Sequence, residues 1–213
     1  MNTEYNGNKS WKEILKGAGF IKQFLIPVII LLLLVYFYSR FLIFIEAREG
    51  FRFTDPLLSF FSPFDLTWII FILLYSSLVW GIFFLIKTPA KLIEALRVYT
   101  IMIAFRILAM YLLPLEPPVT MIPLQDPFIE FFGTGQLLTK DLFFSGHTAT
   151  MFILFLTAKA KRERILFLIV TIVIAALVVI QHVHYTIDVI AAFFFTYCSY
   201  SIVKKLEFYS RKV

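Results

Sequence analysis

The sequence lacks several features that would point to a secreted or multidomain protein. Cys198 is its single cysteine, so no disulfide can form within the chain. The first 22 residues are polar, and the apolar stretch after them is too long for the core of a cleavable signal and has no small-residue cleavage site behind it. We therefore expect the first apolar segment to remain in place as an anchor. No internal repeat, low-complexity stretch or separate soluble domain is evident.

Apolar residues are present in excess. They make up 60% of the 213 residues, phenylalanine occurs 26 times, and the mean hydropathy is +0.85. A soluble domain is roughly 45–50% apolar, so this excess cannot be hidden in one water-facing core. Lipid must be the solvent for much of the surface, which predicts an integral membrane protein.

Six apolar stretches qualify, or nearly qualify, as membrane spans. A hydrocarbon core about 30 Å thick needs roughly 20 helical residues. The sequence therefore predicts an all-α fold class, an integral membrane bundle of six transmembrane helices. The predicted spans are 24–45, 66–86, 98–114, 142–159, 165–181 and 184–203. The loop 114–127 carries five prolines and is expected to be ordered but not helical.

These spans define the expected domain organisation. A cytoplasmic or interfacial segment, 1–23, precedes the transmembrane domain 24–203, and a basic cytoplasmic tail, 204–213, follows it. Residues 10–22 are expected to lie along the interface as a basic amphipathic segment, with Trp11 and Ile14 toward lipid.

Basic residues are distributed unevenly among the connecting segments. Fifteen lie in the N-terminal segment, in the loops after the second and fourth spans, and in the tail. The opposite loops hold three, Arg48, Arg52 and Lys140, among eight acidic residues. The positive-inside rule then makes both termini cytoplasmic. This distribution explains the net charge of +6 without a nucleic-acid partner.

All three histidines fall at the outer ends of predicted spans. His147 is near the start of the fourth span, and His182 and His184 lie where the chain turns into the sixth. Asp188 follows His184 by four residues, so the two side chains share a helix face. A carboxylate there can hold one ring nitrogen and leave the lone pair of the other free to attack. His147 alone would also fit a polar residue at the interface.

Ser145 and Gly146 precede His147 at the expected start of a helix. Free N–H groups and the positive end of the helix dipole favour a phosphate there, and Gly146 lets it come close. Arg106 lies near the middle of the third span, where a charge is costly and marks a functional site or a buried pair. Its planar guanidinium can grip phosphate oxygens. Together these residues predict a phosphoryl-transfer site on the outer, non-cytoplasmic face, with no metal and no cofactor.

Simpler interpretations of these residues also fit the sequence. His184 and Asp188 could be a structural hydrogen-bonded pair, and Arg106 could be paired with Glu94 or another carboxylate. His182 and His184 could bind zinc together with Asp188, although histidine-based phosphoryl transfer requires no metal. His182 is given no catalytic role, because it could simply cap the helix or line the entrance.

Two segments resemble the signature segments of a known family. Residues 141–148 (DLFFSGHT) and 182–189 (HVHYTIDV) resemble those of the sphingomyelin synthase family, within the wider type 2 phosphatidic acid phosphatase superfamily. Residues 105–111 (FRILAMY), with the proline-bearing loop after them, resemble an earlier segment of that family. By motif the resemblance covers residues 95–200, and by helix count and orientation nearly the whole chain.

The resemblance implies a role for each candidate residue. His184 would be the nucleophile that forms a phosphohistidine, oriented by Asp188. His147 would protonate the departing lipid alkoxide and then act as base toward the acceptor hydroxyl. The residues that would hold the phosphate are Arg106, Ser145 and Gly146. The family passes a phospho-headgroup from a glycerophospholipid to ceramide, so the implied partners are membrane lipids: a phospholipid donor and ceramide or another lipid alcohol as acceptor.

The sequence departs from the lipid phosphatases of the superfamily at two places. Val178 stands six residues before His184, where those enzymes place an arginine. Lys91 and Arg97 are one residue too close together for their Lys-x6-Arg-Pro segment, and no proline follows. Both departures favour the synthase branch, although Lys140 replaces the glycine that precedes the aspartate in the synthase motif.

Three functions are therefore considered. The first is a sphingomyelin-synthase-like lipid phosphotransferase. The second is a lipid phosphate phosphatase, which runs the same first half-reaction with water as acceptor. The third is a non-catalytic membrane protein that binds or transports lipid. The third is disfavoured because the chain keeps all three catalytic groups.

Overall fold

The computed structural model describes residues 11, 24–125 and 137–209, and within them the fold is all-α, as predicted. Phe51 and Leu115 form an isolated β-bridge, and no strand occurs in this part of the chain. The α-helices are α2 (Ile26–Ala47), α3 (Thr67–Ile86), α4 (Pro89–Leu112), α6 (Gly146–Thr157), α7 (Lys161–Ile180) and α8 (Thr186–Tyr209), with a short 3-10 helix η2 (Leu58–Phe60). The predicted interfacial segment 10–22 lies outside the described residues, except for Trp11.

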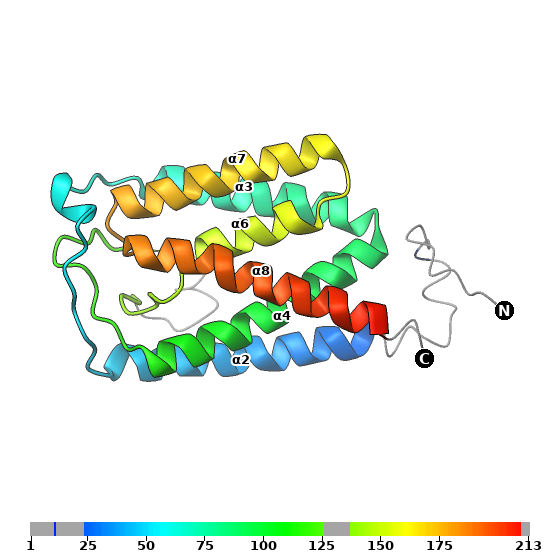
Figure 1. The fold of residues 1–213 in the computed structure, drawn as a ribbon, viewed down its shortest axis with the longest axis horizontal. Helices are drawn as coiled ribbons and strands as arrows, with labels where there is room; N and C mark the ends of the chain where they lie inside the picture. Colours follow the sequence, from blue (N-terminus) through cyan, green and yellow to red (C-terminus); the bar gives the residue numbers. More distant parts are fainter. Residues whose placement is uncertain (1–10, 12–23, 126–136, 210–213) are drawn as a thin grey trace.

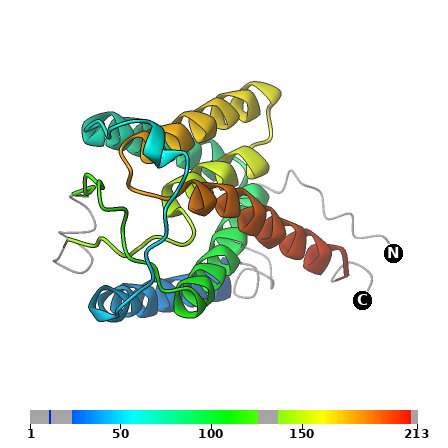
Figure 2. The same ribbon diagram turned by 60° about the vertical axis from the view of Figure 1, so that its left-hand side comes forward.

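Helix α6 lies at the centre of the bundle. It packs against α3, α4, α7 and α8, and α2 packs on the outside against α4. Figures 1 and 2 show the shorter α6 surrounded by its longer neighbours. Short connections at 87–88 and 158–160 make α3 and α4, and likewise α6 and α7, neighbours in space.

Four of the described helices are long and apolar enough to cross a membrane by length and composition: α2, α3, α7 and α8. Helix α4 has 24 residues but carries charges at Lys91, Glu94, Arg97 and Arg106. Helix α6 has 12 residues and is therefore about 18 Å long, shorter than a hydrocarbon core of about 30 Å. The structure thus supports an integral membrane protein with four clear spans, and six spans stay a prediction.

Helix ends differ from the predicted spans where local chemistry overrides hydropathy. Helix α4 begins at Pro89 rather than at 98, because proline suits the first turn of a helix whose charges depress the local hydropathy. Helix α6 begins at Gly146 rather than at 142, because Ser145 accepts a hydrogen bond from the Thr148 N–H and caps the helix. Helix α8 continues to Tyr209, beyond the predicted end at 203.

The two ends of the bundle are chemically different. One end holds the starts of α6 and α8 and the last turns of α4, and we call it the histidine end. The other holds the connections 87–88 and 158–160, and we call it the basic end. The sequence-predicted site residues all lie in, or within two residues of, the helix segments of the histidine end.

Candidate active site

The imidazole rings of His147 and His184 lie beside each other at the histidine end. Their centroids are 6.2 Å apart and their planes are inclined by 64°. His147 is in the first turn of α6, and His184 stands two residues before α8. Two predicted site residues from different helices are therefore brought to one place.

Asp188 stands behind His184 in the first turn of α8. Its Oδ2 atom is 3.4 Å from His184 Nδ1 and accepts a 3.0 Å hydrogen bond from the Tyr185 N–H. The His184 and Asp188 side chains are 2% and 0% exposed. Because Nδ1 faces the carboxylate, Nε2 is the ring nitrogen left for another partner.

Ser145 joins the start of α6 to the start of α8. Its backbone N–H donates a 3.1 Å hydrogen bond to the carbonyl oxygen of Asp188. Its buried hydroxyl accepts from the N–H of Thr148 at 3.4 Å and from the hydroxyl of Thr148 at 3.2 Å. The Ser145 side chain is thus occupied as a helix cap, and its predicted contact with phosphate stays a prediction.

Arg106 reaches the start of α6 from α4. Its Nε donates to the Phe144 carbonyl at 2.9 Å, and its Nη2 donates to Asp141 Oδ1 at 2.6 Å. A Cβ atom built on Gly146 would lie 2.5 Å from Arg106 Nη1, closer than real Cβ atoms come to any neighbour. The structure gives Gly146 a role that the sequence did not suggest, because its missing side chain makes room for the guanidinium itself.

The carboxylate paired with Arg106 is Asp141, and Glu94 is wrong as its partner. Glu94 accepts hydrogen bonds from Lys91 and Lys204 at the basic end. Asp141 also accepts a 2.9 Å hydrogen bond from the Tyr38 hydroxyl of α2. Sequence reasoning assigned no role to Asp141, because a contact made across 35 residues leaves no local pattern.

His182 has partners of its own, separate from the His147–His184 pair. Its Nδ1 is 2.5 Å from Thr120 Oγ1, and its ring packs edge-on against Phe61. Its φ of 56° lies in the left-handed region and turns the chain between α7 and α8. Burial lowers the pKa of His182, which favours the neutral imidazole. Among the described residues, no three His, Cys, Asp or Glu side chains are grouped to hold a metal ion.

Charged contacts fix the segment that leads into α6. Glu46, at the end of α2, accepts hydrogen bonds from the N–H groups of Thr139 and Lys140, each at 2.9 Å. Lys140 Nζ in turn donates to Glu116 at 2.7 Å. This hydrogen bond is the main cause of a lowered pKa of Glu116, which keeps the carboxylate charged. The loop 114–117 and the end of α2 therefore fix the position of the segment that leads into α6.

Asp55 holds the start of α8 and was missed by sequence reasoning. Its carboxylate accepts from the Thr186 N–H at 2.6 Å, from the Thr186 hydroxyl at 3.2 Å and from the Leu57 N–H at 2.9 Å. An acidic side chain at a helix start satisfies free N–H groups and complements the dipole. Asp55 is 131 residues from Thr186, and in the sequence it resembles the other acidic residues of its loop.

Replacing Asp55 by alanine is expected to lower both stability and activity. Loss of such a cap costs about 1 kcal/mol, and it would loosen the turn that carries Asp188. Asp65→Ala is the matched control, because exposed Asp65 likewise accepts from a helix-start N–H, that of Thr67 in α3. Thermal unfolding and turnover in detergent check both variants. An Asp65→Ala variant that loses as much activity as Asp55→Ala would contradict a specific role for Asp55.

Residues 140–206 match a family model described as PAP2 superfamily C-terminal. The matched segment includes His147, His184 and Asp188, whereas Arg106 lies before it. No curated protein and no solved structure matches the chain. Members of the superfamily are lipid phosphatases and phosphotransferases, and the match supports an enzyme of this broad kind. The match covers about a third of the chain, and over α6, α7 and most of α8 it supports a likeness to the C-terminal part of the type 2 phosphatidic acid phosphatase superfamily.

Proposed function

We propose that this protein is a membrane lipid phosphotransferase of the sphingomyelin synthase type, acting through a phosphohistidine on His184. The observation that carries the proposal is the pair of His147 and His184 rings, 6.2 Å apart, with Asp188 behind His184. Two imidazoles at this separation can act on opposite sides of one phosphoryl group, and hydrogen-bond reach is the geometric test for a general acid or base.

In the first half-reaction, the Nε2 lone pair of His184 attacks the phosphorus of the donor lipid. The bond between phosphorus and the diacylglycerol oxygen breaks, and His147 gives its proton to the departing alkoxide. Asp188 holds Nδ1 of His184 and stabilises the positive charge that develops on the ring. Arg106 and the free N–H groups at the start of α6 balance the charge on the phosphoryl oxygens.

In the second half-reaction, the acceptor hydroxyl replaces diacylglycerol. His147, now neutral, takes the proton of that hydroxyl, and the oxygen attacks the phosphohistidine. The phosphorus–nitrogen bond breaks, which releases the new phospholipid and restores both histidines. The acceptor in this proposal is ceramide or another lipid alcohol.

Two departures from the phosphatase pattern support a lipid acceptor over water. Val178 stands where the superfamily phosphatases carry an arginine; it is fully buried, and its carbonyl accepts from the His184 N–H. Lys91 and Arg97 lie toward the basic end, where Lys91 pairs with Glu94 and Arg97 with Glu207. Neither is placed to grip a phosphate beside His184.

A lipid phosphate phosphatase is the second candidate. The family match favours it as well, because the superfamily includes enzymes that pass the same intermediate to water. The transferase differs only in keeping water away while the phosphohistidine waits for its acceptor.

The active site is proposed to face the non-cytoplasmic side. The histidine end is opposite the connections that carry Lys87, Lys91 and Lys159, and the positive-inside rule places such connections in the cytoplasm.

Labelled donor lipid separates the two candidates. Protein purified in detergent is incubated with a phospholipid labelled in its headgroup, with and without ceramide. The transferase is expected to move the label to ceramide, at a rate that depends on ceramide concentration. Release of free phosphate or phospho-alcohol alone, unchanged by ceramide, would support the phosphatase instead. The His184→Ala variant, purified in the same detergent, gives the background for both products.

A further inference from the structure

The turn between α7 and α8 has an unfavourable backbone conformation. Helix α7 ends with the N–H of His182 donating to the Val179 carbonyl at 2.9 Å. The N–H of Val183 donates to the Val178 carbonyl, also at 2.9 Å, which completes the hydrogen-bond pattern that ends many helices in a left-handed residue. That residue is usually glycine, but here it is His182, with a φ of 56°. Because a Cβ atom makes the left-handed region unfavourable, contacts from outside the turn must hold it.

The side chain of Gln181 supplies contacts of this kind. It belongs to a residue with 0% exposure. Its Oε1 accepts from the Leu66 N–H at 2.9 Å, and its Nε2 donates to Thr67 Oγ1 at 2.8 Å and to the Ile122 carbonyl at 3.1 Å. The backbone carbonyl of Gln181 also accepts from the Ile122 N–H at 3.3 Å. The amide therefore uses its oxygen and both of its N–H groups.

These hydrogen bonds join parts of the chain that are far apart in sequence. Leu66 and Thr67, at the start of α3, are 115 and 114 residues before Gln181. Ile122, in the loop after α4, is 59 residues before it. Figure 1 shows the start of α3, this loop and the α7–α8 turn at the same end of the bundle. Gln181 thereby fixes the turn against two segments that carry none of the predicted site residues.

His184 depends on this turn because its own contacts are long. Its Nδ1 is 3.4 Å from Asp188 Oδ2, and its N–H donates to the Val178 carbonyl at 3.3 Å. Hydrogen bonds from nitrogen donors are commonly about 2.9–3.0 Å long, so these two contacts hold the residue loosely. Since His184 follows Gln181 by three residues, a displaced turn would carry the imidazole with it.

We propose that Gln181 is a positioning residue, which anchors the turn so that Nε2 of His184 stays within reach of a phosphoryl group between His184 and His147. This inference rests on the function proposed above for the two histidines. Gln181 acts through the backbone of the turn and does not touch the substrate. A misplacement of about 1 Å can cost about 10²-fold in rate. Without this anchor, kcat should therefore fall while the KM for the donor lipid changes little.

Replacing Gln181 by methionine tests the proposal, since methionine fills a similar volume and makes none of the amide hydrogen bonds. Turnover is expected to fall about 100-fold. The chain has three histidines, so nitrogen-15 spectra of histidine-labelled protein can be assigned with the help of His184→Ala. In the wild type the proton of the neutral His184 ring is expected on Nδ1, which faces Asp188. In Gln181→Met the ring signals should shift toward a mixture of both tautomers, which a loss of stability alone does not cause in folded protein.

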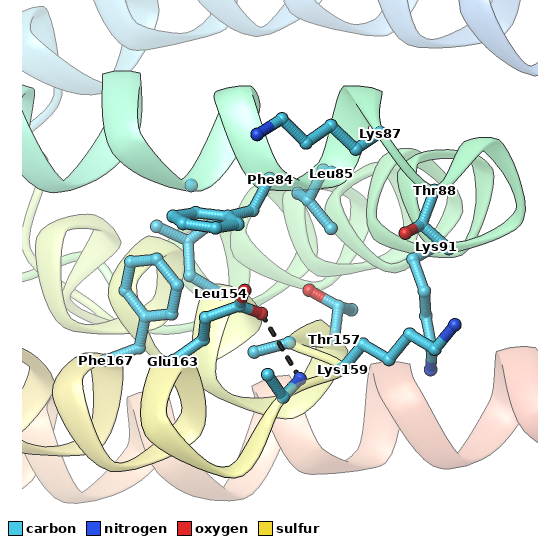
Figure 3. Close-up of a pocket in the computed structure, with 13 residues that line it drawn as sticks. Phe84, Leu85, Lys87, Thr88, Lys91, Leu154, Thr157, Lys159, Glu163 and Phe167 are labelled. Carbon is cyan, nitrogen blue, oxygen red and sulfur yellow. Dashed lines mark hydrogen bonds between the residues drawn. The ribbon is translucent and has the colours of Figure 1, made fainter.

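Two threonine variants complete the test. Thr67→Val removes the hydroxyl that accepts from Gln181 Nε2, so kcat and the His184 signals should change in the same direction but by less. Thr157→Val is the matched control at the basic end, where Thr157 lines the pocket drawn in Figure 3. Thr157 is fully buried in α6 and its hydroxyl donates to the Ile153 carbonyl at 2.7 Å. Its replacement should change neither kcat nor the His184 signals.

The proposal is overturned if folded Gln181→Met keeps the wild-type kcat, or if its kcat falls while the His184 signals stay unchanged. It is also overturned if Thr157→Val disturbs both as strongly as Gln181→Met does. Should Gln181→Met fail to fold, Thr67→Val decides, and wild-type behaviour of that variant overturns the proposal. If the wild type transfers no phosphoryl group, the proposed function fails, and the His184 signals alone decide whether Gln181 positions the ring.

Discussion

Replacing His184 or His147 by alanine is expected to abolish turnover. Without His184 no phosphohistidine can form, and without His147 the diacylglycerol oxygen must leave as an unprotonated alkoxide. Acid–base help of this kind is worth about 10²–10⁴-fold in rate, and loss of a nucleophile removes the covalent route altogether. Product formation from labelled donor lipid measures both effects. Full activity in either variant would rule out the proposed chemistry.

His182→Asn is the matched control for both alanine variants. His182 lies two residues before His184 but contacts Thr120 and Phe61, and asparagine tolerates its left-handed backbone. This variant should keep most of the wild-type activity, even if it unfolds at a lower temperature. Thermal unfolding of all three variants shows whether a loss of activity comes from chemistry or from folding.

Trapping the intermediate distinguishes the two catalytic histidines. Donor lipid carrying a labelled phosphate should leave an acid-labile, base-stable label on the wild-type protein after rapid denaturation. The His184→Ala variant should carry none at any time. A label of the same amount on His184→Ala protein would move the nucleophile to another residue.

Replacing Gly146 by alanine is expected to lower turnover by about 100-fold. The added methyl group would lie 2.5 Å from Nη1 of Arg106, so the guanidinium must shift by about an ångström, and misplacement of that size can cost about 10²-fold. Arg106 is also bound to Asp141 and to the Phe144 carbonyl, so it cannot move freely. Steady-state kinetics with labelled donor lipid measure the loss.

A double-mutant cycle shows whether Gly146 acts through Arg106. Arg106→Ala should weaken activity without changing the products, and Gly146→Ala should then add almost nothing to that loss. Gly81→Ala is the matched control, because its methyl group would also approach a side chain to less than 3 Å, that of Leu154, but not the side chain of Arg106. If Gly146→Ala costs as much in the Arg106→Ala background, the methyl group acts on the substrate directly.

Much of the fold follows from hydropathy and loop chemistry. The apolar runs predict six helices, and the structure has a helix at each of them. The predicted fourth span is longer than α6. Hydropathy starts the span at residue 142, whereas Ser145 caps the helix and α6 begins at Gly146. The predicted third span is shorter than α4, because the charged residues in the first turns of α4 lower the hydropathy but do not interrupt the helix.

The sequence pattern singled out the residues of the candidate site but missed the residues that support them. His184 and Asp188 are one helical turn apart, so their pairing can be derived from spacing alone. Asp55, Asp141 and Tyr38 act through contacts across 35 to 131 residues, which periodicity cannot register. Gly146 was singled out, but the neighbour that needs its small size could be identified only in three dimensions.

The short length of α6 has a consequence for substrate choice. If the end of α6 at the α6–α7 connection lies at one water boundary, its first residue lies about 12 Å beneath the opposite boundary, since 12 residues cover about 18 Å of a core about 30 Å thick. A phosphoryl group that reaches His147 must therefore descend below the headgroup plane, where a charge is costly unless groups such as Arg106 and the N–H groups at the start of α6 balance it. Both kinds of phosphate lose hydration in that descent, but acyl chains hold a lipid phosphodiester in the bilayer, whereas a water-soluble phosphate ester has no such anchor. We therefore expect the protein to select substrates first by how deep in the bilayer their phosphate can lie, and only then by their headgroup.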